Sequence, residues 1–376
     1  MSTELKNVVV IGVGLAAANL VKQLSQSLPS SHRLVAITST NVAFYAPAAL
    51  RAAVVPGWED KPIVELDRLL NSADKRHTII YNTVTELHDN HVTLQTPDTQ
   101  FGSRVEFDYA VIATGSNYVF PCRPGKGARS AQDVIQQFKQ TQQDVKESSS
   151  ILVVGAGPVG IEFAGEVAAQ YPDKQVTLVS GSDTLLPDFK PSVGNSLSEQ
   201  LQKLGVKVVY GTKVDVDGLD TGKIDSRSFN LGQAGTVQAD YILIATGNKP
   251  NTSLVSQYDS AAVNSAGLVK VQPTLQLVSH DNMFAIGDVT DVQETKLAYN
   301  SEAHVPVIVS NVLSLIKQSA TSKTLKPGAK VIVVTCGPHG GAAQLPVFGL
   351  VVGGFLTSQI KSKTLFIPKF RATFNY

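Results

Sequence analysis

The sequence is poor in cysteine and has no surplus of charge. Its two cysteines, Cys122 and Cys336, are too far apart to form a Cys-x-x-Cys pair. The sequence therefore offers no disulfide framework and no redox-active dithiol, and it fits a reducing compartment. With a formal net charge of only +1 over 376 residues, the protein has no overall positive potential that would favour nucleic-acid binding. No zinc-ligand spacing, catalytic-serine elbow or P-loop occurs, so we expect neither a metal site nor nucleic-acid binding.

Signals for export or membrane insertion are also missing. The N-terminus lacks an apolar signal core and has no glycine at position 2, which leaves secretion and myristoylation unsupported. The longest apolar run near the C-terminus, 346–356, is too short to span a bilayer. We expect a cytoplasmic protein that is not secreted, and leave open peripheral attachment to a mitochondrial or lipid-droplet membrane.

Acidic residues are absent from the segment 303–376, which carries eight Lys or Arg residues. Towards its end the cations alternate with aromatic residues: Lys361, Lys363, Phe366, Lys369, Phe370, Arg371, Phe374 and Tyr376. Such a mixture can lie on an anionic lipid surface. A solvated edge, or packing around an anionic cofactor, explains the composition equally well.

What the sequence does contain is one pattern of motifs that occurs twice. The first copy begins with an apolar run at 8–11, bends at Gly12-Val-Gly14 and continues into a helix-like stretch to about 28. It closes with Ala113-Thr114-Gly115. Short apolar runs bounded by glycine are typical of strands buried on both faces, which predicts a parallel sheet.

The second copy repeats these signals in the same order. It begins with an apolar run at 151–154, bends at Gly155-Ala-Gly157, continues as a helix to about 170 and closes with Ala-Thr-Gly247. A third apolar run then ends at Gly287-Asp288. We therefore expect an α/β protein with two Rossmann-type dinucleotide-binding domains.

Further segments complete the expected organisation. Alternating short strands predict an antiparallel insertion at about 77–107, and a polar patch at 136–150 separates the two copies. A helix at about 298–317 and strand candidates at 331–334 and 348–352 indicate a small α+β C-terminal region. The expected divisions are 1–118 and 251–322 for the first domain, 119–250 for the second, and 323–376 for the C-terminal region.

The two glycine motifs carry the chemistry. A strand that runs into Gly-x-Gly-x-x-Gly or Ala opens a helix whose free N–H groups attract a pyrophosphate. A glycine-rich turn in an ordinary α/β domain is the alternative for either match alone. The motif residues are Gly12, Gly14 and Ala17 in the first copy and Gly155, Gly157 and Gly160 in the second. Two dinucleotides in one chain indicate hydride transfer from a nicotinamide to a flavin.

These motifs, in this order, resemble the flavoprotein oxidoreductases with two dinucleotide-binding domains. The likeness is greatest to the apoptosis-inducing-factor-like branch that includes the ferroptosis suppressor, with type II NADH dehydrogenases more distant. The segments 44–51, 296–299 and 361–366 carry this closer likeness. The resemblance implies FAD in the first copy, and NADH or NADPH as the substrate of the second.

The resemblance also implies site residues. Asp288 would accept a hydrogen bond from a ribityl hydroxyl, Arg51 would face a phosphate, and Glu162 would lie near both rings. Lys296, Lys361 and the helix beginning at Ala298-Tyr299 would stabilise charge on the flavin. The remaining cofactor positions are Thr38, Ala113, Thr114, Gly115, Ser180, Gly247 and Gly287. Ordinary solvated positions remain the alternative for Arg51, Glu162 and the two lysines.

One departure from the pattern concerns the adenosine riboses. A Rossmann fold normally offers an acid after its second strand, yet no Asp or Glu occurs between Leu5 and Trp58. Thr38 stands at that position in the first copy and Ser180 in the second. Because Ser180 does not repel a 2′-phosphate, NADPH is as admissible as NADH.

Isolated histidines and cysteines receive weaker predictions. His304 and His339 lie in the segment expected to approach the flavin, but a lone histidine is more often structural. Cys122 and Cys336 have no accompanying motif, so we expect small packed residues rather than nucleophiles.

The combined interpretation is an FAD-dependent NAD(P)H oxidoreductase that passes electrons to a quinone or to oxygen. Without a Cys-x-x-Cys pair, a dithiol substrate is disfavoured. Two alternatives stay open: a slow NADH-responsive redox switch in death signalling, and an electron donor to a protein partner. Turnover with soluble quinones separates the enzyme from the switch.

Overall fold

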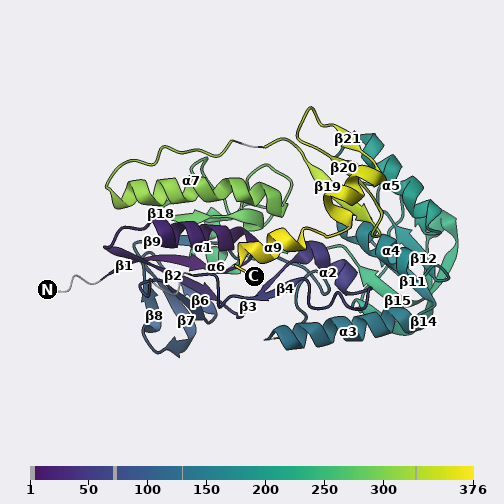
Figure 1. Ribbon diagram of the computed structural model, residues 1–376, viewed down its shortest axis with the longest axis horizontal. Coiled ribbons are helices and arrows are strands. Elements are labelled where there is room, and N and C mark those ends of the chain that lie inside the picture. The colour runs from purple at the N-terminus through teal and green to yellow at the C-terminus, as the bar shows by residue number, and fades with distance from the viewer. Residues whose placement is uncertain (1–4, 71–73, 129, 327) are drawn as a thin grey trace.

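The computed structural model describes residues 5–70, 74–128, 130–326 and 328–376. A six-stranded and a five-stranded sheet form two neighbouring halves, and a third, three-stranded sheet lies beside the second half (Figure 1). Within the described ranges, no helix combines the length and apolarity needed to cross a bilayer.

The six-stranded sheet has the order β17-β18-β9-β1-β2-β5. Its strands are β1 (Lys6–Ile11), β2 (His32–Thr38), β5 (Thr78–Tyr81), β9 (Tyr109–Ile112), β17 (Gln276–Leu277) and β18 (His280–Ala285). All neighbouring pairs are parallel except β17 with β18. The helices α1 (Leu15–Ser27) and α7 (Ala298–Ile316) pack together over one face, as Figure 1 shows. Strand β18, from a late segment of the chain, pairs in parallel with β9 of this sheet.

The other face of this sheet is covered by a small antiparallel sheet and by α6 (Ser253–Tyr258). The small sheet consists of β6 (Val84–Leu87), β7 (His91–Asp98) and β8 (Gly102–Glu106). The predicted start of the insertion at 77 is wrong, because β5 pairs in parallel with β2. As the edge strand of its sheet, β5 is only partly buried, so it lacks the long apolar run of the inner strands.

The five-stranded sheet has the order β13-β12-β11-β15-β14. Its strands are β11 (Ser150–Val154), β12 (Gln175–Val179), β13 (Lys207–Val209), β14 (Gly222–Asn230) and β15 (Thr236–Ile244), and its helices are α3 (Ala131–Glu147), α4 (Pro158–Gln170) and α5 (Pro191–Lys203). In each half the first strand lies between the second strand and the strand that closes the copy. The repeat seen in the sequence is therefore a repeat of topology.

The polar patch at 136–150, which separates the two copies in the sequence, is mostly helix. Helix α3 buries Val134, Phe138 and Val145, which recur at helical spacing among the glutamines. Its start is fixed by a capping box between Ser130 and Asp133. The low share of apolar residues concealed this narrow buried stripe.

The C-terminal region forms a three-stranded antiparallel sheet with three short helical segments. These are β19 (Ile332–Cys336), β20 (Gly340–Gln344), β21 (Val351–Val352), α8 (Gly354–Thr357), the π-helical turn η4 (Ser358–Ser362) and α9 (Ile367–Thr373). Strand β20 was not expected, because its small residues carry little strand signal. They are required by close packing: a Cβ on Gly341 would lie 2.4 Å from the Val334 carbonyl oxygen.

Helix α9 leaves the C-terminal region and packs on the first half, beside α1. There Phe370 and Phe374 are buried, and Phe370 stacks on Tyr45 with ring centroids 4.7 Å apart. Lys369 pairs with Glu302 of α7. Phe370 and Phe374, two of the aromatic residues that a lipid surface could have accommodated, therefore belong to the core.

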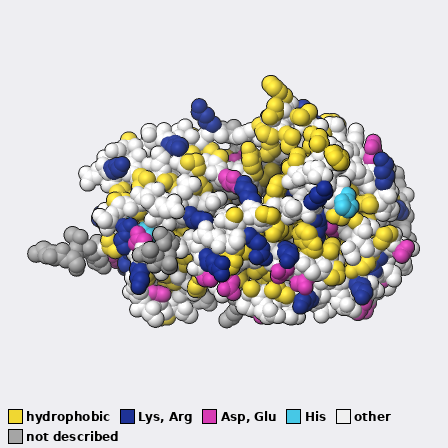
Figure 2. All heavy atoms as spheres, viewed as in Figure 1, with side chains coloured by type: hydrophobic (Ala, Val, Ile, Leu, Met, Phe, Trp, Pro, Cys, Tyr) yellow, Lys and Arg dark blue, Asp and Glu magenta, His cyan; other side chains and the backbone are white. Residues whose placement is uncertain are grey.

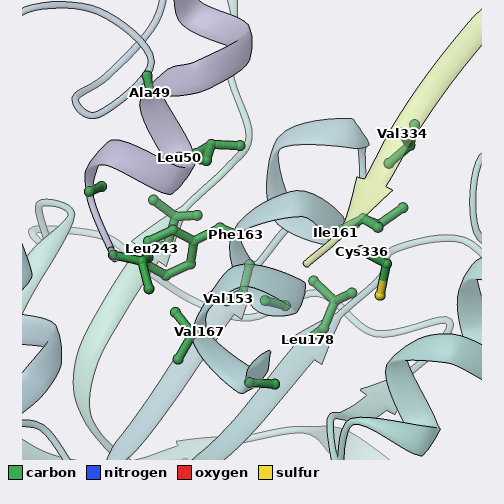
Figure 3. Close-up of a cluster of buried hydrophobic side chains, with 14 of the residues drawn as sticks. Ala49, Leu50, Val153, Ile161, Phe163, Val167, Leu178, Leu243, Val334 and Cys336 are labelled. Atoms are coloured by element: carbon green, nitrogen blue, oxygen red, sulfur yellow. The ribbon is translucent and has the colours of Figure 1, made fainter. Parts of the chain in front are cut away.

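Short elements connect these parts. They are β3 (Val42–Phe44), α2 (Ala46–Ala52), β4 (Ile63–Glu65), β10 (Ser116–Asn117), β16 (Lys249–Pro250) and 3-10 turns at Gly232–Ala234, Ser260–Ala262 and Gly287–Val289. The two segments linking the halves pair with each other as antiparallel β10 and β16. Figure 3 shows α2 contributing Ala49 and Leu50 to the core around Phe163 of α4.

Candidate active site

The first glycine of each motif makes the same contact in both halves. Gly12 has φ +98°, and a Cβ there would lie 2.6 Å from the carbonyl oxygen of Ala113. Gly155 has φ +106°, and its Cβ would lie 2.9 Å from the carbonyl oxygen of Ala245. Only glycine combines this conformation with so close an approach. Each glycine bend is therefore held directly against the Ala-Thr-Gly turn of its own half.

The second glycine of each motif is needed for a different reason. Gly14 and Gly157 are the N-cap residues of α1 and α4, with extended backbone that any residue can adopt. A Cβ on either would meet no protein atom within 4 Å. Neither helix start receives a side-chain cap hydrogen bond. Open space in front of uncapped N–H groups fits a pyrophosphate, so the residues present suit one dinucleotide at each bend.

The third position of each motif serves packing. A Cβ on Gly160 would lie 1.9 Å from the Gly155 carbonyl oxygen, so α4 lies directly against its bend. Ala17, at the same position of the first motif, is 1% exposed. The first half thus accommodates a methyl group where the second half tolerates none.

The turn after β18 brings Asp288 beside the first Ala-Thr-Gly segment. Its Oδ2 accepts a hydrogen bond from Ser116 Oγ at 2.8 Å. The preceding Gly287 has φ +77°, and its N–H donates to Nδ1 of His304 at 3.4 Å. His304 is fully buried, and its Nε2 lies 2.9 Å from Glu294. These contacts give His304 a structural role in holding the turn that carries Asp288.

Lys296 lies in the loop between this turn and α7. Its Nζ donates to the carbonyl oxygens of Thr290 at 2.8 Å and Val292 at 3.0 Å. Burial lowers the pKa of Lys296. Helix α7 begins at Ala298, and the next residue, Tyr299, is 60% exposed. The lysine therefore stabilises the loop that leads into α7, the helix expected to point at the flavin.

Glu162 and Lys361 are brought together from positions far apart in the chain. Glu162, in the second turn of α4, accepts Lys361 Nζ at 2.7 Å and the Thr335 N–H at 3.0 Å. Lys361 also donates to the Val333 carbonyl oxygen at 2.9 Å. Both side chains are buried, with exposures of 8% for Glu162 and 10% for Lys361. The result is a buried charged pair that joins η4 of the C-terminal region to α4, the helix that starts at the second glycine bend.

Arg51 is placed differently from the prediction. Its Nε donates to Glu166 Oε2 at 2.9 Å, its Nη2 lies 2.5 Å from Glu166 Oε1, and its Nη1 donates to the Ser362 carbonyl oxygen at 2.6 Å. The ring of Trp58 lies 4.8 Å from the guanidinium carbon. The expected phosphate contact is thus replaced by a buried ion pair. Sequence reasoning missed Glu166 because 115 positions separate it from Arg51.

The two positions expected at the riboses are both buried at strand ends. Thr38 is the last residue of β2 and is 7% exposed. Ser180 follows β12, donates its hydroxyl to the Ser182 carbonyl oxygen at 2.9 Å and accepts the Ser182 N–H at 3.1 Å. The Ser180 hydroxyl is therefore occupied by its own turn.

The two Ala-Thr-Gly turns lie close to the segments that link the halves. Thr114 Oγ1 donates to the Asn251 carbonyl oxygen at 2.7 Å, and the Asn251 side-chain amide donates back to Thr114 at 3.0 Å. Gly115 and Gly247 both have positive φ, +64° and +86°. The first closing turn therefore contacts the segment that returns from the second half to the first.

A cation that sequence reasoning missed lies beside Gly115. A Cβ on that glycine would lie 3.3 Å from Arg123 Nη2, and the buried Arg123 Nε has no hydrogen-bond partner among the described residues. Tyr118 nearby accepts a hydrogen bond from Asn248 at 2.8 Å. No motif marks Arg123, since only folding places it at the Ala-Thr-Gly turn.

The remaining candidates take no part in this arrangement. Cys122 and Cys336 are buried free thiols, and burial raises the pKa of each to about 12. They stay protonated at neutral pH, which disfavours a role as nucleophile. His339 is exposed in the turn between β19 and β20.

Comparison with known proteins agrees with this architecture. Residues 6–305 match the family described as pyridine nucleotide-disulphide oxidoreductase. The chain is 30% identical to ferroptosis suppressor protein 1 of Taeniopygia guttata over 96% of this chain and 94% of that protein. It is 29% identical to apoptosis-inducing factor homolog B of Dictyostelium discoideum, covering 100% of this chain and 98% of that protein.

Solved structures show the same fold at lower sequence identity. NDH2 from Plasmodium falciparum in complex with NADH aligns with a TM-score of 0.73 at 16% identity, covering 98% of this chain and 97% of that chain. The sulfide:quinone oxidoreductase of Aquifex aeolicus aligns with a TM-score of 0.71 at 17% identity, covering 98% and 92%.

Fold and site define a flavoprotein oxidoreductase with two Rossmann-type halves, one for FAD and one for NAD(P)H. The chain belongs to the pyridine nucleotide-disulphide oxidoreductase family, on the branch of the apoptosis-inducing factor homologs and ferroptosis suppressor protein 1. The predicted fold class, family resemblance and cofactors are confirmed. The chain is an NAD(P)H-dependent flavin oxidoreductase.

Proposed function

We propose that the chain reduces a quinone with electrons taken from NAD(P)H. Bound FAD accepts hydride and passes on two electrons, which is chemistry that no side chain supplies. The observation that carries the proposal is the buried pair between Lys361 of η4 and Glu162 of α4, the helix that begins at the NAD(P)H bend. A structural relative, the enzyme from Aquifex aeolicus, is named for its quinone.

The pair supplies what quinone reduction needs beyond electrons. Reduction of a quinone by NAD(P)H consumes one proton in addition to the hydride. Lys361 holds a proton at Nζ, and Glu162 and the Val333 carbonyl keep that group buried and oriented. A dithiol acceptor is disfavoured, because Cys122 and Cys336 are separate buried thiols.

The experiment is anaerobic NAD(P)H oxidation with a soluble short-chain quinone. We expect quinone-dependent turnover that Lys361→Met lowers by about 100-fold or more, the scale of a lost proton donor. The matched control is Lys363→Met, because Lys363 is exposed two residues away. If NAD(P)H is oxidised only after air is admitted, and the quinone makes no difference, oxygen is the acceptor. A reduced flavin that persists in the presence of both would favour the slow redox switch.

We also propose a contact between the C-terminal region and an anionic lipid surface, at residues different from those the sequence indicated. Large exposed hydrophobic side chains cluster there: Val347, Phe348, Leu350, Phe355, Leu356 and Ile360. Figure 2 shows hydrophobic side chains gathered over the part of the molecule where Figure 1 places β19–β21. Because the segment 303–376 contains no acidic residue, its charge suits an anionic surface.

A further inference from the structure

Helix α2 lies between the two halves and packs on both. Its Ala48 belongs to the core cluster that contains α1 and α7 of the first half. The neighbouring Ala49 and Leu50 belong to the cluster around Phe163 and Leu243 of the second half, as Figure 3 shows. The contacts that Ala49 and Leu50 make with the second half are apolar, and hydrophobic burial is non-directional.

Arg51 adds directional contacts at this junction. It is 2% exposed, and both of its bonds to Glu166 reach across to α4, one helical turn beyond Glu162. Its third bond holds the Ser362 carbonyl oxygen, next to Lys361. One guanidinium therefore ties the first half, the second half and the C-terminal region together. A planar fork with fixed donors specifies orientation as well as distance.

Packing does not enclose the pair on every side. A cavity of about 150 Å³ borders Arg51, Trp58 and Glu166. This cavity lies where α2 and α4 meet. The hydrogen bonds of Arg51 to Glu166 and to Ser362 add directional restraints at this contact.

We propose that Arg51 and Glu166 are a positioning pair that sets the spacing between the two dinucleotide-binding halves. Hydride transfer requires the reacting atoms to lie about 3–3.5 Å apart, and a displacement of about 1 Å can cost about 100-fold in rate. The pair touches neither reacting ring in this account. It acts through α4, which carries both Glu162 and the NAD(P)H bend.

The experiment must separate positioning from ordinary stabilisation. Breaking only one side of a buried pair leaves an unpaired charge and destabilises the fold, whereas replacing both partners by apolar residues is often neutral or stabilising. The informative variant is therefore Arg51→Met/Glu166→Leu. The limiting rate of flavin reduction at saturating NADH is measured by stopped flow, beside the apparent Kd for NADH, the flavin content and the Tm.

We expect the double variant to retain its flavin and a Tm near that of the wild type, while its limiting reduction rate falls by about 10- to 100-fold. The control is Lys369→Met, which removes an exposed pair with Glu302 and should leave the rate unchanged. A double variant that reduces its flavin as fast as the wild type would overturn the proposal.

A second variant covers the case in which the double variant does not fold. Arg51→Lys keeps the charge but cannot donate to Glu166 and to Ser362 in the fork geometry. A lowered rate at unchanged flavin content supports the positioning role, and an unchanged rate refutes it. The proposal rests on NADH reducing the flavin. A wild-type protein that NADH does not reduce would therefore indicate a failure of that activity rather than of the pair.

Discussion

Gly14 and Gly157 occupy the same position in the two halves. A single substitution at each can therefore test the binding of one nucleotide without affecting the other. A side chain at either would fill open space in front of an uncapped helix start. Each charged hydrogen bond lost there is worth about 1.5–3 kcal/mol. We expect Gly157→Val to raise the KM for NAD(P)H by about 10- to 100-fold with flavin retained. Gly14→Val should instead yield protein depleted of FAD.

Gly328 provides the control for these substitutions. A Cβ there also meets no atom within 4 Å, and the residue is exposed away from both bends. Gly328→Val should leave flavin content and KM unchanged. The assignment of the second bend fails if Gly157→Val binds NAD(P)H as well as this control does.

At the scale of elements, the loop between β20 and β21 makes the proposed lipid contact testable. Phe348 is 97% exposed and Val347 63% exposed in this loop. Burial of one such side chain contributes about 1.5–3 kcal/mol. We expect the wild type to sediment with anionic vesicles, and Phe348→Ser to weaken that partitioning by about 10-fold or more.

Tyr81 serves as the matched control for this element, because it is 51% exposed on β5, in the first half. Tyr81→Ser should partition like the wild type, and neutral vesicles should bind less protein than anionic ones. The proposed lipid contact is contradicted if Phe348→Ser and Tyr81→Ser lose vesicle binding equally, or if the wild type does not sediment with anionic vesicles.

At the scale of the whole molecule, the features that could be predicted from the sequence are those that depend on residues close together in the chain. The spacing of Gly12, Gly14 and Ala17 after an apolar run is local, so the bend and its partner copy could be identified. Arg51–Glu166 depends on how two distant helices pack, which no local pattern reveals. The burial of Phe370 likewise follows from the return of α9 to the first half.

The central claim is that one chain holds FAD and NAD(P)H in neighbouring halves and passes hydride between them. The most direct measurement is the visible spectrum of the purified protein under anaerobic conditions, before and after addition of NADH or NADPH. We expect a yellow protein whose flavin absorbance is bleached by at least one of the two nucleotides. A colourless protein, or a flavin spectrum that neither nucleotide changes, would contradict it.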